Sequence, residues 1–338
     1  MKINKSDLKR MIKEELIAVL GEGGNIFKGE TARIPLEYIE PTLDKYRDEL
    51  VKLFPKQEQQ FAEFNPVGSV GKKAYSGDID VAFDVKSFFP DGVVDANDFA
   101  AWNVDPEEWE AKYSQIKKRA RTATEEMSKW KAFLSLIAKY INENSDIIKV
   151  AEKKTKFSNI FTLFPQYSPE GDQMDIGVQI DWMVGNLKWL KFAYYSDAPV
   201  ENLKGLHRTQ LLLSMFNTKG YSFVHGMGVR NKETGEYIVR DVDDALELLG
   251  NLYGSPIDEE QTKKYYSLYN YLVKNSNPGL YRETMDTYIK ILDSTRADVP
   301  LNLQDYWRKN KDRLGLTGRY LPDTSKLRIT NETLRGNK

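Results

Sequence analysis

Apolar residues recur at two spacings along the chain, and each spacing predicts a different element. Residues 107–143 have helical composition, and from Met127 to Ile141 the apolar residues stand three or four positions apart, which predicts a helix with one buried face. From 78 to 85 they alternate with polar or small residues, as in a half-buried strand. Further strands are predicted at 61–67, 147–151, 157–164 and 173–184. We expect the last two to join the sheet as an antiparallel pair.

Proline positions and the later apolar pattern place the remaining elements. Pro41 suits the first turn of a helix, so we expect a helix from Pro41 to Leu53. After Pro199 the chain becomes largely helical. Helices are predicted at 202–217, 241–250 and across 258–313, with a short hairpin within 221–239.

The two ends of the chain differ from the middle. Residues 6–20 predict an amphipathic helix with Ser6 as its N-cap, and a glycine-rich linker follows. The last residues are polar and show no periodicity. We therefore expect a terminal helix with its linker, a core, a helical lobe and a polar tail, at 1–24, 28–198, 199–320 and 321–338.

The composition narrows the chemistry. The chain has no cysteine and two histidines, which excludes thiolate sites and disfavours zinc. A metal would be held by carboxylates, which suits Mg²⁺ or Mn²⁺. The net charge of −1 gives no overall basic field for nucleic acid. No apolar stretch is long enough to span a membrane or to act as a secretion signal, so we expect a soluble protein.

Asp78 and Asp80 are the strongest candidates for a metal site. One residue separates them on a predicted strand, so both side chains leave the same face, roughly 6–7 Å apart along the chain. Two such carboxylates can share the metal ions of a phosphoryl displacement. Upstream, Gly68 allows a phosphate to approach the backbone and Ser69 offers a hydroxyl. Two cations follow in the same loop, Lys72 and Lys73.

The segment from Val67 to Val81 resembles the signature of the DNA polymerase beta-like nucleotidyltransferase superfamily. That signature is a Gly-Ser or Gly-Gly pair, a loop, and Asp-x-Asp on a strand; the loop here is eight residues long, slightly shorter than is usual. The resemblance implies an α+β fold with a short mixed sheet backed by helices and a helical lobe after it. It also implies attack of an acceptor hydroxyl on the α-phosphate of a nucleoside triphosphate (NTP), with Mg²⁺ or Mn²⁺.

Superfamily members carry a third carboxylate on a neighbouring strand, and this chain offers Asp175 and Asp181. The two are six residues apart, roughly 20 Å on an unbroken strand, so only one can complete the site. We favour Asp181 because its neighbours are more strand-like, and we keep Asp175 as the alternative. Its implied role is to orient the acceptor hydroxyl and help deprotonate it.

The resemblance also suggests groups that contact the nucleotide. After the third strand, Lys204, His207 and Arg208 are candidates for the triphosphate, and the guanidinium of Arg208 suits bidentate phosphate contact. Tyr194 and Tyr195 stand where relatives place aromatic residues against the base. His225, in an apolar stretch predicted as strand, is expected to be structural.

The acceptor is the least determined part of the prediction. Basic residues on the two walls of the predicted cleft could follow a phosphate backbone. One wall would carry Lys117, Lys118, Arg119 and Arg121, and the other would carry Lys204 and Arg208. On this basis we favour transfer to an RNA 3′ end, with tRNA-like ends first. The alternatives are a protein-nucleotidylating (AMPylating) enzyme, an oligonucleotide-synthesising enzyme, or a catalytically silent phage structural protein of this fold.

The first residues carry a second, weaker resemblance. Residues 2–16 are similar to short helical leaders of tailed-phage proteins, and Leu20-Gly21-Glu22 is similar to the motif that their head proteases cleave. This resemblance implies removal of residues 1–22 and an enzyme of the host cytoplasm or the virion.

Overall fold

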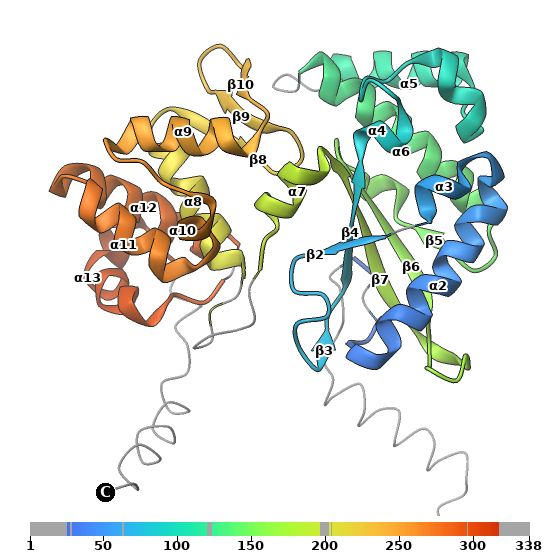
Figure 1. The fold of residues 1–338 in the computed structure, drawn as a ribbon, viewed down its shortest axis with the longest axis horizontal. Coiled ribbons are helices and arrows are strands. Elements are labelled where there is room, and N and C mark those ends of the chain that lie inside the picture. The colour runs from blue at the N-terminus through green and yellow to red at the C-terminus, as the bar shows by residue number, and fades with distance from the viewer. Residues whose placement is uncertain are drawn as a thin grey trace, which may run out of the picture. The chain divides into compact units, whose positions relative to one another are not determined.

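The computed structural model describes residues 26–27, 29–62, 64–119, 124–196, 203, 205–295 and 297–317 (Figure 1). Within this part of the chain, no helix is long and apolar enough to cross a membrane. The chain divides into two compact units. Unit 1 comprises Met1–Pro199 with His225–Gly228, and unit 2 comprises Val200–Val224 with Val229–Lys338.

Unit 1 is built around a five-stranded mixed sheet in the order β2-β4-β7-β6-β5. Its strands are β2 (Asn65–Val67), β4 (Ile79–Asp84), β5 (Lys149–Val150), β6 (Asn159–Tyr167) and β7 (Gln173–Gly185). β4 and β7 run parallel, and the other neighbouring pairs are antiparallel. β6 and β7 form the longest pairing of the sheet, which the sequence predicted as a hairpin.

Helices pack against one face of this sheet. α2 (Leu36–Leu53) and α6 (Glu125–Asn144) contact β6, and α5 (Pro106–Arg119) packs on α6. Hydrogen bonds as well as apolar contacts join α2 to the sheet. The buried Tyr46 hydroxyl lies 3.0 Å from Thr162 Oγ1, and it accepts a hydrogen bond from Trp182 Nε1 at 2.7 Å. Trp182 therefore points into the core.

Shorter elements complete unit 1. A two-stranded ribbon pairs β1 with β3, and α7 contacts β4 and β7. The short elements are β1 (Ile34–Pro35), η1 (Pro55–Gln57), α3 (Glu58–Phe61), β3 (Tyr75–Ser76), α4 (Val85–Phe88), η2 (Ala96–Trp102), η3 (Glu152–Lys154) and α7 (Leu187–Ala193).

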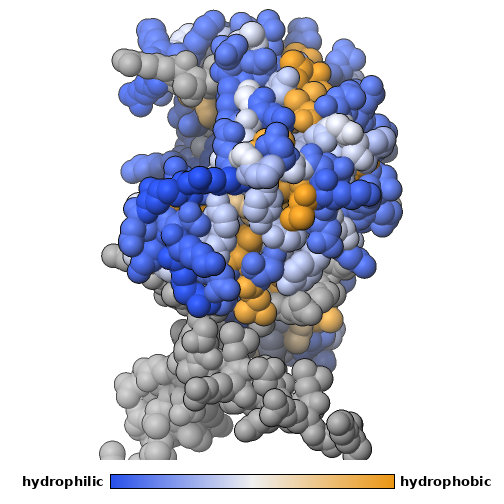
Figure 2. All heavy atoms as spheres, turned by 90° about the vertical axis from the view of Figure 1, so that its left-hand side faces the viewer, coloured by the Kyte–Doolittle hydropathy of each residue, from blue (hydrophilic) through white to orange (hydrophobic). Residues whose placement is uncertain are grey.

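Unit 2 is helical apart from a small antiparallel sheet. α11 and α12 pack on α8, with Tyr253, Tyr265 and Tyr288 buried. The face in Figure 2 is mainly hydrophilic, with apolar residues in separate small groups rather than one patch. The elements are α8 (Gly205–Thr218), β8 (Tyr221–Val224), β9 (Gly228–Asn231), β10 (Tyr237–Val239), α9 (Val242–Tyr253), α10 (Glu259–Lys263), α11 (Tyr265–Asn275), α12 (Pro278–Ser294), η4 (Leu301–Leu303) and α13 (Gln304–Leu314).

The predicted α+β class is confirmed, with a mixed sheet backed by helices and a helical part after it. The helix predicted to begin at Pro41 begins instead at Leu36. Pro35 is the N-cap residue, with φ −60° and ψ 149°, and the Leu36 amide donates to the Ala74 carbonyl at 2.9 Å. Pro41 lies inside the helix, where its missing amide proton leaves the Glu37 carbonyl without that partner.

One other boundary was wrong. Phe61 ends a helical turn, so the strand predicted from that residue starts at Asn65. The segment 107–143 is helical as predicted, and it is divided between α5 and α6. The hairpin predicted within 221–239 is confirmed as β9 and β10, which pair antiparallel on either side of residues 232–236, and β8 adds a third strand. The terminal helix, its linker and the polar tail lie outside the described residues.

Candidate functional site

Three carboxylates lie together on neighbouring strands of unit 1. Asp80 of β4 and Asp181 of β7 are direct partners in the parallel register. Asp78 immediately precedes β4. Asp181 is buried, with 5% of its surface exposed, whereas the other two are half-buried. Asp175, the alternative third carboxylate, is exposed near the other end of β7 and borders a separate pocket.

The carboxylates occupy the sheet face opposite to α2. Side chains alternate along a strand, so Trp182 points to the core while Asp181 and Met183 point the other way. We call this side the carboxylate face. Toward the ends of β4 and β7, Leu190 of α7 and the following Tyr194 pack with Met183 and cover it. The acids therefore stand beside an apolar wall.

Burial and mutual repulsion disfavour the charged forms of the acids. Burial, then the charge of Asp78, raises the pKa of Asp181 to about 7. Burial also raises the pKa of Asp80 well above its ordinary value, and the charges of Asp78 and Asp181 add to this. Burial raises the pKa of Asp78 too. Without a cation the three groups cannot all ionise freely.

Gln179 holds the buried member of the set. Its Nε2 donates to both oxygens of Asp181, at 2.8 and 3.0 Å, which lowers the pKa of Asp181. The Ile26 amide donates in turn to Gln179 Oε1 at 3.1 Å. This chain of bonds orients the Asp181 carboxylate.

The donor set suits a hard divalent ion, since all three groups supply carboxylate oxygens and a cation would relieve their repulsion. In the described part of the chain, however, no group of three or more His, Cys, Asp or Glu side chains is arranged to hold a metal ion. The strand positions fit metal binding, whereas the side chains would have to turn toward a common point to chelate it.

Gly68 brings backbone against the carboxylates. It lies directly after β2 with a φ of 68°, a left-handed value that favours glycine. A Cβ at this position would lie 2.8 Å from Asp80 Oδ2. The Gly68 amide donates to the Tyr194 carbonyl at 3.1 Å, and Ser69 follows, half-buried. The turn is thereby held beside Asp80.

The two loop lysines differ in their contacts. Lys72 Nζ donates to the Gly68 carbonyl at 3.1 Å and to the Ser196 carbonyl, and lies 5.4 Å from the centre of the Tyr195 ring. In this conformation Lys72 ties the glycine turn to the segment after α7. Lys73 is half-buried in the same loop.

Tyr194 borders the carboxylates. Burial, then the charge of Asp80, raises the pKa of its hydroxyl. Its ring lies 5.2 Å from the ring of His225. His225 was predicted in a strand, but β8 ends at Val224 and His225 lies in the following turn.

The remaining nucleotide candidates belong to unit 2. Arg208 is 2% exposed, and its Nε donates to the Thr262 carbonyl at 2.7 Å. His207 is also buried, with Nε2 2.9 Å from the Asp298 carbonyl. These contacts give both side chains a packing role within unit 2. Lys204 lies outside the described residues.

The predicted basic wall is partly described. Lys117, Lys118 and Arg119 are exposed at the end of α5, whereas Arg121 lies outside the described residues. Sequence reasoning missed two residues next to the acids, Gln179 and Lys156. Gln179 had a usable signal, because a residue two positions from Asp181 on a strand shares its face.

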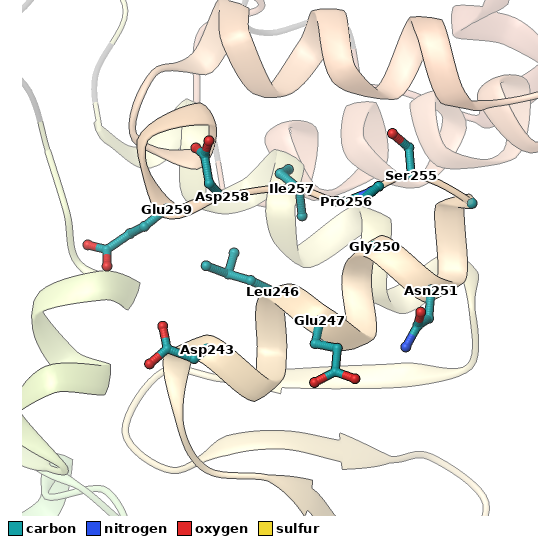
Figure 3. A pocket seen from close by; sticks show the side chains of 11 residues that line it. Asp243, Leu246, Glu247, Gly250, Asn251, Ser255, Pro256, Ile257, Asp258 and Glu259 are labelled. Atoms are coloured by element: carbon teal, nitrogen blue, oxygen red, sulfur yellow. The ribbon is translucent and has the colours of Figure 1, made fainter.

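A pocket of about 710 Å³ lies in unit 2, between α9 and the segment leading into α10. Figure 3 shows Leu246 and Ile257 facing each other, with acidic side chains around them. The acids that line it are Asp243, Glu247, Asp258 and Glu259. Four carboxylates would repel a triphosphate, so this pocket is a poor nucleotide site.

No protein family and no curated protein matches the chain in sequence. Among solved structures, a ternary complex of Leishmania infantum polymerase beta matches with 12% sequence identity and a TM-score of 0.35. The alignment covers 75% of this chain and 87% of that chain.

Proposed function

We propose that the protein is a metal-dependent nucleotidyltransferase, which transfers a nucleoside monophosphate from an NTP to an acceptor hydroxyl. The proposal rests on the arrangement around Asp80. Asp80 lies directly opposite Asp181 on the neighbouring strand, and the turn at Gly68 lies so close to Asp80 that a Cβ would not fit there. A sheet built only for stability has little reason to gather buried acids whose charges oppose one another.

Each group has a defined task in this reaction. Asp78, Asp80 and Asp181 would hold Mg²⁺ or Mn²⁺, which when bound would neutralise phosphate charge and acidify the acceptor hydroxyl. Asp181 accepts a hydrogen bond from that hydroxyl and helps remove its proton.

The glycine turn and its neighbours receive the nucleotide. Gly68 lets the phosphates approach the backbone and the Ser69 hydroxyl donates to them. Lys73 offsets phosphate charge, and Lys72 joins it after leaving its carbonyl partners. Tyr194 forms the apolar wall for the base. Arg208 is buried within unit 2, where its Nε donates to the Thr262 carbonyl, and it is not assigned to the reaction. Lys204, outside the described residues, is not assigned either.

The acceptor we propose is an RNA 3′ end. Exposed lysines in the connection between β5 and β6 support an anionic polymer over a neutral hydroxyl compound, whereas the cations of α5 lie on the helical side of the sheet. We also propose that the leader is removed after Glu22 in a phage particle, which mass spectrometry of the native protein would show as a chain starting at Gly23.

The proposal is tested first by binding. Calorimetry with a non-hydrolysable ATP analogue should show binding that depends on Mg²⁺ or Mn²⁺, and analogues of the other NTPs extend the test. Absence of binding for all four with either metal contradicts the proposal. Incubation with each α-labelled NTP and host RNA should then place label in nuclease-sensitive product; label lost only to protease would make a protein the acceptor.

A further inference from the structure

Lys156 lies at the edge of the carboxylate face on its β6 side. Phe161 of β6 is the direct antiparallel partner of Asp181, so both side chains lie on the same face of the sheet. Lys156 is exposed, and its Nζ lies 5.3 Å from the centre of the Phe161 ring.

Other cations and an aromatic ring lie in the same connection between β5 and β6. Lys153 and Lys154 are exposed in η3, and Lys131 Nζ lies 5.2 Å from the centre of the half-buried Phe157 ring. Lys153, Lys154 and Lys156 form no ion pair with a described residue. We call Lys153, Lys154 and Lys156, with Phe157 and Phe161, the β6 strip.

The order of the strands separates the two substrates. The glycine turn lies on the β2 side of Asp80, and the β6 strip lies on the far side of Asp181. A triphosphate on the glycine turn leaves Asp181 between the nucleotide and the strip. The acceptor must bring its hydroxyl to Asp181, so it approaches from the β6 side.

We propose that the β6 strip binds the phosphates next to the 3′ end of a nucleic-acid strand and so positions its terminal hydroxyl at Asp181. This assignment rests on the proposed function and adds the surface that holds the acceptor. Exposed, unpaired lysines beside the half-buried Phe157 suit single-stranded nucleic acid, because lysines contact phosphates and an accessible ring contacts a base, whereas the buried Phe161 only supports Lys156. Lys156 is thus a positioning residue.

The test is strand binding without NTP. A double variant, Lys154→Gln with Lys156→Gln, is compared with a control double variant, Lys45→Gln with Lys56→Gln. The control lysines are also exposed and unpaired, but they lie on α2 and η1. Fluorescence anisotropy with labelled twelve-nucleotide RNA, and with DNA of the same sequence, gives the dissociation constant at several salt concentrations.

We expect the β6 strip variant to bind both strands about tenfold more weakly than wild type. The slope of log K against log salt should fall by about 1.4, because each lost contact to a single strand removes about 0.7. The control variant, Lys45→Gln with Lys56→Gln, should retain the wild-type slope. Equal behaviour of the two variants, or a loss confined to RNA or to DNA, overturns phosphate recognition by the strip.

Calorimetry with the ATP analogue distinguishes failure of the strip assignment from failure of the proposed function. If nucleotide binding is intact and both variants bind strands alike, the strip assignment fails and the proposed function stands. If wild type binds no nucleotide, the proposed function fails. In turnover assays Lys156→Gln should raise the KM for the strand more than the KM for the NTP, which a general loss of folding would not do.

Discussion

Replacing Asp181 with Asn should make the metal-free protein more stable at neutral pH. In the folded protein the pKa of Asp181 is raised from 3.8 to about 7. Between these values the folded protein retains a proton that the unfolded chain has lost, so stability falls as pH rises, by about 1.4 kcal/mol per pH unit. The fall is complete above pH 7 and totals about 4 kcal/mol.

Asn at this position is uncharged and still offers Gln179 an acceptor. The variant should match wild type near pH 4 and exceed it by about 4 kcal/mol at pH 8. Removing the charge of Asp181 also lowers the pKa of Asp80, which acts in the same direction.

Urea unfolding in the presence of a chelator, at several pH values, measures the difference. Tryptophan emission reports mainly on unit 1, which holds five of the six tryptophans, among them Trp182 beside the substituted residue. Parallel pH profiles for the two proteins would refute the reasoning, since they would mean that Asp181 ionises as easily in the folded as in the unfolded protein.

Three further predictions concern the same face. Mg²⁺ should raise the melting temperature of wild type more at pH 8 than at pH 5, and less for Asp80→Asn; an equal shift at both pH values would indicate binding elsewhere. Gly68→Ala should reduce the rate of nucleotide transfer at least tenfold, because the added Cβ would lie 2.8 Å from Asp80 Oδ2. Gly71→Ala is the control, since Gly71 has a similar φ of 72° and no atom within 4 Å of an added Cβ; it should lose only about 1 kcal/mol of stability through backbone strain. Asp181→Asn should abolish transfer of labelled nucleotide while Asp175→Asn keeps most of it, and the reverse result would move the third carboxylate to Asp175.

The strands could be predicted from the sequence because alternation is a local signal. Residues 78–85 and the pair of strands ending near 184 appear as predicted, apart from their ends. The register between β4 and β7 is not local, since its partners are about a hundred residues apart, and only that register places Asp181 rather than Asp175 beside Asp80.

Side-chain roles were harder to predict than strands. Arg208 has the chemistry of a phosphate ligand, but a sequence does not reveal that its guanidinium donates to Thr262 in a buried position. Lys156 belongs to no motif, and its relation to Asp181 arises only from the pairing of β6 with β7. The helix start at Leu36 was missed because Pro35 and Pro41 both suit the beginning of a helix.

The bonds from Ile26 through Gln179 to Asp181 bear on where the chain can be shortened in the laboratory. A truncated protein that begins after residue 26 would retain all three acids, the glycine turn and the whole sheet. It would nevertheless lose the amide that holds the Gln179 side chain. Such a protein would fold normally but hold Asp181 less firmly. Weak activity measured with it should not be taken as the activity of the full chain.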